Sequence, residues 1–289
     1  MNTPLSPTLA QWHAAGGVFR HAVGPIFLRA EGNGPDLLFI HGFPTASWDW
    51  AKIWPSFTAH FHCQALDMIG FGFSPKPIDF TYSIHAQADL FEQVLVAQGV
   101  TETAIIAHDY GDTVTQELLA RHNEGRLPFA IKRIVLLNGG LFPETHRPLL
   151  LQKLLASPLW PFVARMSTYR KFAVNMRKIC ARSLTDGECQ AMWQLMSGNN
   201  GLAVLPKLIG YMEERRQFRA RWFGALQESR VPIRLINGVD DPISGTHMVA
   251  RYREVIPDPD IVELAGVGHY PQVEAAEDVV VAAMGFLRG

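Results

Sequence analysis

AIIAHDYG, residues 104–111, joins an apolar run to a short polar turn. Its second half, AHDYG, has the order small residue, any residue, nucleophile, any residue, glycine. That order is typical of a nucleophile elbow, a sharp turn from a strand into a helix that exposes one side chain. We therefore predict a buried strand over 104–107, a helix over 112–122, and Asp109 presented on the turn between them.

An aspartate at this turn changes the chemistry that the turn supports. A serine that attacked a saturated carbon would form an ether, which is a dead end, whereas a carboxylate would form an ester. Water can then release the product by attacking the carbonyl carbon of Asp109. The aspartate therefore indicates an electrophile whose reacting carbon is saturated, such as an epoxide or an alkyl halide.

Predicted strands and helices alternate on both sides of this turn. Continuous apolar runs suit buried parallel strands, and apolar spacings of three and four suit helices. The sequence predicts a hairpin over 18–29, strands over 36–40, 62–66, 133–137, 233–236 and 261–264, and helices over 48–57, 83–99 and 274–287. The alternation predicts an α/β fold, with a mostly parallel sheet and helices on both of its faces.

The segment 141–230 interrupts this alternation, because it contains no clear strand. Helical spacing recurs in it over 149–155, 162–178, 188–196 and 202–216. We expect a core formed by residues 1–140 and 231–289, and a helical cap inserted at 141–230. The alternative is an independent second domain, but both flanks return to the same sheet pattern. Ligands bind beyond the carboxyl ends of parallel strands, so the cap is expected to cover that edge.

The loop HGFP, residues 41–44, follows the first buried strand of the sheet. A loop at this place can aim the amide N–H of Phe43 at a developing oxyanion. The amide N–H of Tyr110, directly after the nucleophile, is expected to be the second donor. A further loop, DMIGFGFS at 67–74, is expected to be structural, because its glycines permit tight turns and Asp67 can bond nearby backbone.

The loop GVDDP, residues 238–242, follows the strand expected over 233–236 and offers two carboxylates. Asp241 is the expected partner of a catalytic imidazole, since it directly precedes the proline, while Asp240 suits a turn or a helix N-cap. His269 comes after the last predicted strand and is the expected general base. His108, beside the nucleophile, is expected to pack or to form a hydrogen bond.

Composition and charge give expectations about the partners, the cysteines and the location of the protein. The chain has 289 residues, ordinary globular composition and a net charge of −1, so no nucleic-acid or anionic-membrane partner is implied. Its three cysteines have no metal-binding spacing, and their odd number argues against a disulfide framework. The first residues lack the features of a signal peptide, and no stretch approaches the length of a membrane span. A cytoplasmic protein without metal or cofactor is the expectation.

The turn, the loops and their order resemble the α/β-hydrolase superfamily over nearly the whole chain. HGFP, the elbow aspartate and the loop of His269 look most like the branch of epoxide hydrolases and haloalkane dehalogenases. HDYGDTVTQELL (108–119) and NGGLFPETHRPLLLQKLL (138–155) resemble the mesoderm-specific transcript protein-like subgroup.

This resemblance implies roles for the residues at matching positions. Asp109 would be the nucleophile, His269 the base, Asp241 its acid partner, and Phe43 and Tyr110 the donors of the oxyanion hole. Epoxide hydrolases also use two cap tyrosines that donate to the epoxide oxygen. Tyr211 fits the later one, and Tyr169 is the only other tyrosine in the insertion.

The leaving group separates the two candidate reactions. An opened epoxide is an alkoxide that needs a proton, which a tyrosine can donate, whereas a halide needs only N–H donors. Haloalkane dehalogenases tend to carry Trp and Asn where this chain has Tyr110 and Phe43. We therefore expect hydrolysis of a small hydrophobic epoxide to a vicinal diol. The alternatives are haloalkane dehalogenation, hydrolysis of another ester or lactone, and a non-catalytic role. A homodimer is compatible with the chain.

Overall fold

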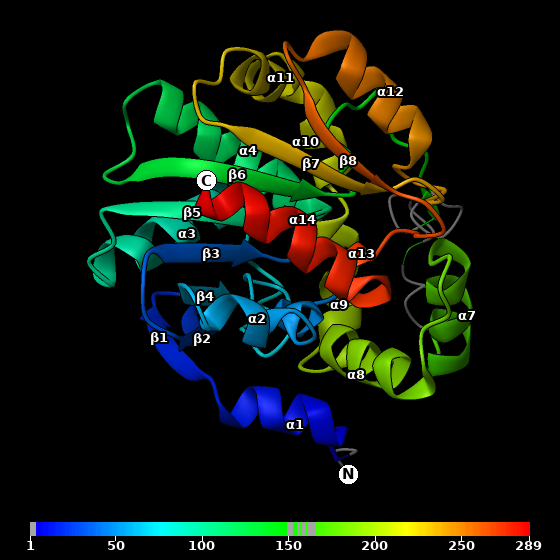
Figure 1. Cartoon of the computed structure of the whole chain (residues 1–289). Coiled ribbons are helices and arrows are strands. Elements are labelled where there is room, and N and C mark those ends of the chain that lie inside the picture. The colour runs from blue at the N-terminus through cyan, green and yellow to red at the C-terminus, as the bar shows by residue number, and fades with distance from the viewer. Residues whose placement is uncertain (1–3, 149–152, 155–156, 158–159, 161–165) are drawn as a thin grey trace.

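The computed structural model describes residues 4–148, 153–154, 157, 160 and 166–289. Their centre is an eight-stranded sheet in the order β1-β2-β4-β3-β5-β6-β7-β8 (Figure 1). The strands are β1 (Gly17–His21), β2 (Gly24–Glu31), β3 (Asp36–Ile40), β4 (His62–Leu66), β5 (Glu102–His108), β6 (Ala130–Leu137), β7 (Ile233–Gly238) and β8 (Asp260–Leu264). Pairing is antiparallel from β1 to β4 through β2, and parallel from β4 to β8.

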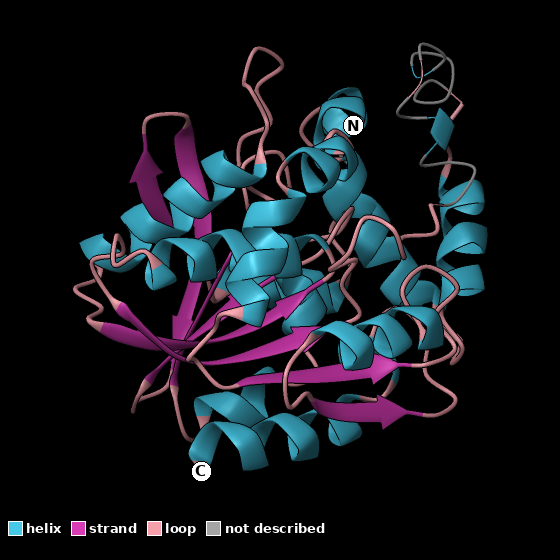
Figure 2. Ribbon diagram, turned by 90° about the horizontal axis from the view of Figure 1, so that it is seen from above, coloured by secondary structure: helices cyan, strands magenta, loops and turns pink. Residues whose placement is uncertain are grey.

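Helices cover both faces of this sheet, as Figure 2 shows. The helices before the insertion are α1 (Pro7–Ala14), the 3-10 helix η1 (Ser47–Trp50), α2 (Trp54–Thr58), α3 (Ile84–Ala97) and α4 (Tyr110–Asn123), and those after β7 are α12 (Thr246–Val255), α13 (Pro271–Glu274) and α14 (Ala276–Arg288). Helix α4 packs against α3, and α14 packs against α2. Six of the seven residues of β5 are buried, as expected of a central strand covered on both faces. The predicted α/β-hydrolase architecture is confirmed.

Between β6 and β7 the described residues contain helices and no strand. These helices are α7 (Tyr169–Ile179), α8 (Asp186–Ser197), α9 (Gly201–Leu208), α10 (Tyr211–Gln217) and α11 (Arg219–Gln227). The helix expected over 202–216 is in fact two, because the chain turns at Ile209 and Gly210. The helix expected over 149–155 falls outside the described residues except for Lys153 and Leu154, and the expected 162–178 helix is described from Tyr169 on.

The helix predicted over 48–57 is also divided, into η1 and α2. Ser47 does not cap it. Its amide and hydroxyl donate instead to Asp67 Oδ1 at 2.8 and 2.6 Å. Asp67 Oδ2 accepts the amide N–H of Phe73 at 2.7 Å, so this carboxylate ties together the loops that follow β3 and β4. Asp67 thus has the structural environment expected from its turn.

Among the described residues, no helix is both long and apolar enough to cross a membrane. The three cysteines are buried free thiols. The same part of the chain contains no group of three His, Cys, Asp or Glu side chains that could hold a metal ion.

Candidate active site

Asp109 lies on a strained turn between β5 and α4. Its backbone angles, φ 49° and ψ −104°, fall in a region that residues with a side chain rarely adopt. Surrounding backbone holds the turn: the amide of Asp109 donates to the carbonyl of Leu137 at 3.2 Å. A Cβ atom at Gly111 would lie 2.3 Å from the carbonyl oxygen of Ile40, so glycine is required there. The sharp turn predicted from the sequence is present.

The carboxylate of Asp109 is already held by a backbone donor. The amide N–H of Phe43, in the loop after β3, donates to Asp109 Oδ2 at 3.1 Å. Tyr110 is the first residue of α4, and the first N–H groups of a helix have no partner within that helix. Two amides from separate loops are therefore available to an oxygen bonded to the Asp109 carbonyl carbon, which is the requirement of an oxyanion hole.

His269 and Asp241 form a buried pair, with His269 Nδ1 and Asp241 Oδ2 2.8 Å apart. Three further groups donate to Asp241: Asn138 Nδ2 at 3.0 Å, the Ser244 hydroxyl at 2.7 Å and the amide of Ile243 at 2.7 Å. These bonds fix the carboxylate, which in turn fixes the orientation of the imidazole. The neighbouring Asp240 is exposed, so the structure pairs His269 with the aspartate preferred from the sequence.

The pKa values of His269 and Asp241 are shifted in opposite directions. Burial opposes the charge on His269, but the carboxylate of Asp241, aided by that of Asp109, raises the pKa of His269 to about 9. Burial likewise opposes the charge on Asp241, yet His269 and the donors around it lower the pKa of Asp241 to about 2. The two shifts together favour the protonated imidazole of His269 beside the ionised carboxyl of Asp241 in the resting site.

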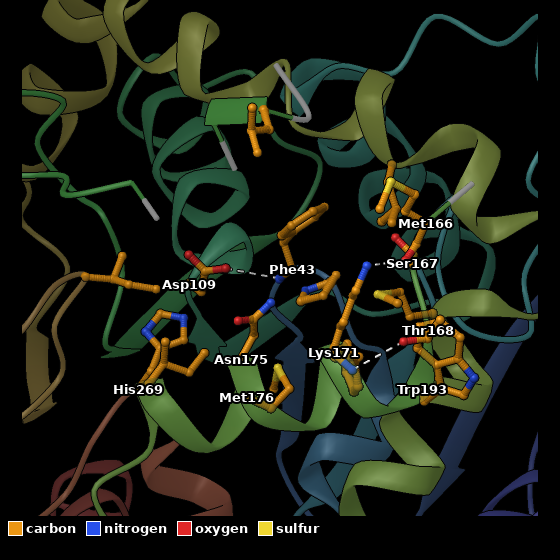
Figure 3. Close-up of a pocket in the computed structure, with 17 residues that line it drawn as sticks. Phe43, Asp109, Met166, Ser167, Thr168, Lys171, Asn175, Met176, Trp193 and His269 are labelled. Carbon is orange, nitrogen blue, oxygen red and sulfur yellow. Dashed lines mark hydrogen bonds between the residues drawn. The ribbon is translucent and has the colours of Figure 1, made fainter. Parts of the chain in front are cut away.

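A cavity of about 310 Å³ opens onto Asp109 and His269 (Figure 3). Its wall combines residues of the core loops with residues of α7, α8 and α9. Most are apolar: Phe43, Pro44, Leu154, Met166, Phe172, Met176, Ile179, Trp193, Met196, Leu205 and Ile243. A largely apolar chamber with a few convergent polar groups is the usual form of a small-molecule site.

Tyr211, at the start of α10, lies behind Phe43 and is not part of the cavity wall as it stands. Its ring centroid is 6.0 Å from that of Phe43 and 5.0 Å from that of Tyr110. The hydroxyl is buried and makes no hydrogen bond of good geometry to the described residues, although the guanidinium of Arg215 lies close enough to lower its pKa. Burial, together with the nearby charge of Asp109, raises the pKa of Tyr211. The structure thus places this phenol beside the nucleophile.

The structure does not bring Tyr169 to the same place. Its hydroxyl donates to the carbonyl of Asp186 at 3.3 Å on the surface, and it is absent from the cavity wall. The reason is helical phase: Lys171 and Asn175, which do line the cavity, share one face of α7. Tyr169 precedes Lys171 by two residues, about 200° around the helix axis, and faces the other way.

Arg215 is a site neighbour that the sequence analysis missed. It is 2% exposed, and its Nη2 donates to the carbonyl oxygen of Asp109 at 3.1 Å. The same Nη2 lies 3.8 Å from Asp109 Oδ1, and Nε donates to the Thr113 hydroxyl at 2.7 Å. Its guanidinium carbon is 4.5 Å from the ring centroid of Tyr211. Because Tyr211 and Arg215 are four apart, the spacing on α10 could have drawn attention to it.

Asn138 and Asn175 were also missed. Asn138 lies at the end of β6 and bridges to β7, since its Nδ2 bonds Asp241 and Gly238. Asn175 is half-buried in the cavity wall, and no hydrogen bond of its carboxamide is found within the described part of the chain. Figure 3 shows it close to Asp109 and Phe43.

His108 connects the elbow to the histidine loop. Burial lowers the pKa of its ring to about 4, and its Nε2–H donates to the carbonyl of His269 at 2.7 Å. The hydrogen-bonding role expected for His108 is the one found.

Comparison with known proteins identifies the family. Residues 35–276 match the family model described as alpha/beta hydrolase fold. The putative hydrolase LipZ of Mycobacterium tuberculosis is 38% identical over 285 residues, which cover 98% of this chain and 99% of LipZ. The mesoderm-specific transcript protein of Mus musculus is 39% identical over 297 residues, which cover 98% of this chain and 89% of that protein. The subgroup expected from the two motif segments is confirmed.

More distant similarities are to two proteins whose names state an activity. The solved structure of haloalkane dehalogenase DbeA from Bradyrhizobium elkani superimposes with a TM-score of 0.77 at 21% identity, covering 95% of this chain and 98% of that one. At this identity the likeness shows the fold alone. Epoxide hydrolase 3 of Mus musculus is 33% identical over 111 residues, which cover 38% of this chain and 29% of that protein.

Proposed function

We propose that this chain, which belongs to the α/β-hydrolase family, hydrolyses epoxides to vicinal diols through an ester on Asp109. The observation that carries the proposal is the surroundings of Asp109. An aspartate stands at the elbow, its Oδ2 is held by the amide of Phe43, and the buried phenol of Tyr211 lies close enough to it for the charge of Asp109 to raise the pKa of that phenol. A carboxylate nucleophile suits a saturated carbon, and a phenol suits an oxygen that leaves as alkoxide.

In the first step, Asp109 Oδ1 attacks one carbon of the oxirane. The bond between that carbon and the ring oxygen breaks, and its electron pair stays on the oxygen. The Tyr211 hydroxyl gives its proton to this alkoxide. The guanidinium of Arg215 over the Tyr211 ring favours the resulting phenolate, since the cation offsets its charge.

In the second step, water attacks the carbonyl carbon of the Asp109 ester while His269 accepts its proton. Forming the ester removes the negative charge of Asp109, which is one of the charges that hold the proton on His269. The pKa of the imidazole therefore falls, so the imidazolium gives up its proton, through solvent, to the Tyr211 phenolate left by the first step. His269 is then neutral and can act as the base of the second step. The oxyanion is held by the amides of Phe43 and Tyr110. On its collapse the ester oxygen of the product leaves and takes the proton of the newly formed Asp109 carboxyl, which completes the diol and restores the carboxylate.

The experiment that tests the covalent route uses His269→Gln with styrene oxide. The variant should form the ester and fail to hydrolyse it, so intact-protein mass spectrometry should show one substrate mass, mapped to Asp109 by peptide analysis. His60→Gln, which changes an exposed histidine, is the matched control and should turn over like the native enzyme. Styrene oxide turnover by the native enzyme without any adduct in His269→Gln would refute the mechanism.

Tyr211→Phe separates epoxide opening from halide displacement. The change removes the phenolic donor and keeps the ring that packs on Phe43 and Tyr110. We expect styrene oxide turnover to fall about 10- to 1000-fold, as for the loss of a general acid or an oxyanion donor. Release of bromide from 1-bromohexane should be nearly unchanged, because a halide needs no proton.

Tyr169→Phe is the control for this comparison and should leave both activities at the native level, because its hydroxyl bonds the surface carbonyl of Asp186. Full epoxide turnover by Tyr211→Phe would remove Tyr211 from the mechanism. Native bromide release that exceeds epoxide turnover would favour the dehalogenase alternative, for which the free carboxamide of Asn175 offers an N–H donor.

A further inference from the structure

The segment between Glu144 and Asp186 is strongly basic, although the whole chain has a net charge of −1. Residues 145–185 include eight Arg or Lys side chains and no Asp or Glu. Leucine, phenylalanine, tryptophan and methionine recur among them, so the segment is apolar as well. An ordinary solvated face mixes both signs of charge, whereas a basic and apolar segment is typical of contact with an anionic lipid surface. The helix that the structure describes in this segment is α7.

Helix α7 has a buried apolar face and an exposed basic face. The buried face packs on α8, where the ring centroids of Phe172 and Trp193 are 5.6 Å apart. The opposite face is exposed, and helical spacing of three and four aligns its side chains, which are Arg170, Lys171, Val174 and Lys178. Figure 1 shows α7 at the outer edge of the insertion. These four exposed residues form the α7 surface.

The cations of the α7 surface are not neutralised by the protein itself. Arg177, at the edge of this surface, is paired with Asp186. Within the described part of the chain, no ion pair involves Arg170, Lys171 or Lys178. Three unpaired cations on one face of a single helix create a local positive field, which the phosphate and carboxylate groups of an anionic bilayer complement.

Exposed apolar side chains accompany these cations. Met166 is 59% exposed and Val174 is 45% exposed. The ammonium of Lys171 donates to the carbonyl of Met166 at 3.1 Å, which places Met166 beside the start of the α7 surface. Apolar side chains among cations can enter the acyl boundary of a bilayer while the cations contact its headgroups. Charge alone would also suit an acidic protein, but the exposure of Met166 and Val174 favours lipid.

The cavity of the candidate active site opens beside the same surface. Of the described residues in its wall, three are exposed, and they are Met166, Thr168 and Lys171. All three lie in the first turn of α7 or just before it, and Figure 3 shows them on the other side of the cavity from Asp109 and His269. A bilayer in contact with the α7 surface would therefore face the mouth of an apolar chamber.

We propose that the α7 surface docks the protein on an anionic lipid bilayer, so that an apolar substrate passes from the membrane into the cavity. The docking rests on the charge, the exposure and the position of the cavity mouth, and it does not depend on the reaction at Asp109. The proposed function adds only that the substrate carries an epoxide. Each cation near an anionic surface strengthens binding about fivefold, so three cations give about 100-fold.

Co-sedimentation with sucrose-loaded vesicles tests the docking. The native protein should bind vesicles of phosphatidylcholine and phosphatidylserine about 100-fold more tightly than vesicles of phosphatidylcholine alone. Added salt should weaken this binding, because ions screen the charge of the headgroups. The double variant Arg170→Gln/Lys178→Gln, which changes two residues outside the cavity wall, should bind about 25-fold more weakly than the native protein.

The matched control is Arg126→Gln/Lys132→Gln, which also removes one arginine and one lysine. Both residues are exposed and lie near the amino end of β6, away from the insertion. This control should bind vesicles like the native protein, and both double variants should keep the native melting temperature because all four side chains are exposed.

The apolar part of the contact has its own test. Val174→Gln should weaken binding to anionic vesicles about 3- to 10-fold, because a side chain that enters the bilayer becomes polar. Val281→Gln is its control, since Val281 is a 76% exposed valine of α14, and it should leave binding unchanged.

Vesicle binding needs no turnover, which keeps this inference separate from the epoxide chemistry. Binding that depends on Arg170 and Lys178, by a protein that does not open styrene oxide, would support the docking and contradict the proposed function. Equal binding of both kinds of vesicle, or binding that survives in Arg170→Gln/Lys178→Gln, would overturn the docking and leave epoxide hydrolysis standing. Binding of polyglutamate through Arg170 and Lys178, without binding of anionic vesicles, would indicate an acidic protein partner and would also overturn it.

Discussion

Asp240 and Asp241 are adjacent carboxylates with opposite surroundings, and this difference gives a sharp test of the acid partner. Asp241→Asn should lower the rate of ester hydrolysis about 10³- to 10⁴-fold, because an amide no longer holds the imidazole in the tautomer that accepts a proton from water. Asp240→Asn should stay within about twofold, since that side chain is exposed. Single-turnover hydrolysis of the ester measures both. Greater damage from the change at Asp240 would mean that the wrong carboxylate had been paired with His269.

His269 gives the expected pH dependence. Only the neutral imidazole can accept a proton from water, and the resting pKa of about 9 falls when the charge of Asp109 is lost. Hydrolysis of the ester should therefore rise with pH, about tenfold per unit at first, and level off below pH 9. Rapid-quench measurements across this range, after the ester has formed at one fixed pH, isolate the step. A rate that falls with rising pH would contradict the assignment of His269 as base.

The positions of some site residues can be predicted from the local sequence, whereas the positions of others depend on how distant elements pack. Asp109 directly follows β5, and Asp241 and His269 lie in the loops after β7 and β8, so all three were expected at the same edge of a parallel sheet. Arg215 reaches the elbow from a helix 106 residues further on, and its contact depends on how the insertion packs. Asn175 depends on the phase of α7 relative to the cavity. Neither a spacing nor a motif records that phase. Tyr169 was selected because it is the only other tyrosine of the insertion, and the phase of α7 turns it away from the cavity.

At the scale of elements, α10 connects the insertion to the nucleophile through Arg215. Arg215→Met should slow epoxide opening about 10- to 1000-fold and lower the melting temperature, because Asp109 and Thr113 lose a buried donor and the cation beside Tyr211 disappears. Arg215→Lys should recover only part of the rate, since an ammonium cannot bond the Thr113 hydroxyl and the Asp109 carbonyl at the same time, as a guanidinium does. Steady-state kinetics and thermal unfolding report the two effects.

Arg216→Met is the matched control, because Arg216 is the next residue of α10, is exposed, and pairs only with Glu213 among the described residues. It should change neither rate nor melting temperature. A native rate in Arg215→Met would show that the contact with Asp109 has no part in the reaction.

The bounds of helices and strands were predicted best where burial in the sheet alone determines them. The strands over 36–40 and 62–66 have the predicted bounds, because a continuous apolar run admits few alternatives inside a covered sheet. The helix expected over 48–57 failed as one unit. The hydroxyl of Ser47, directly before it, donates to Asp67 and does not cap a helix, and this bond between two loops cannot be read from the local sequence. Helix α12 (Thr246–Val255) was not predicted at all.

For the whole molecule, the order of strands in the sheet and the placing of the insertion were beyond sequence reasoning of this kind. Alternation of strands and helices predicts a parallel sheet, but the exchange that puts β4 between β2 and β3 depends on which edges the helices leave free. The insertion is also tied to the core by single side chains whose partners lie far apart in sequence. Lys76 is one of them.

Lys76 lies in the loop after β4, is 7% exposed, and joins that loop to the end of α8. Its ammonium donates to the carbonyl oxygens of Gly72 in the core, Leu195 at 3.3 Å and Gly198 at 3.0 Å. Lys76→Met would leave these acceptors without their donor at a cost of about 1–3 kcal/mol. We expect the melting temperature to fall by several degrees, which differential scanning calorimetry would measure.

The same change should raise KM for epoxides, because α8 supplies Trp193 and Met196 to the cavity wall. Lys207→Met is the control: Lys207 also reaches from the insertion to a core carbonyl, that of Ile78, but it is exposed, so its bond exchanges readily with water. Its loss should shift the melting temperature by no more than about one degree. The opposite result, a native melting temperature for Lys76→Met and a lowered one for Lys207→Met, would show that burial does not decide which of these two lysines stabilises the molecule. The attachment of α8 would then come from its apolar packing alone.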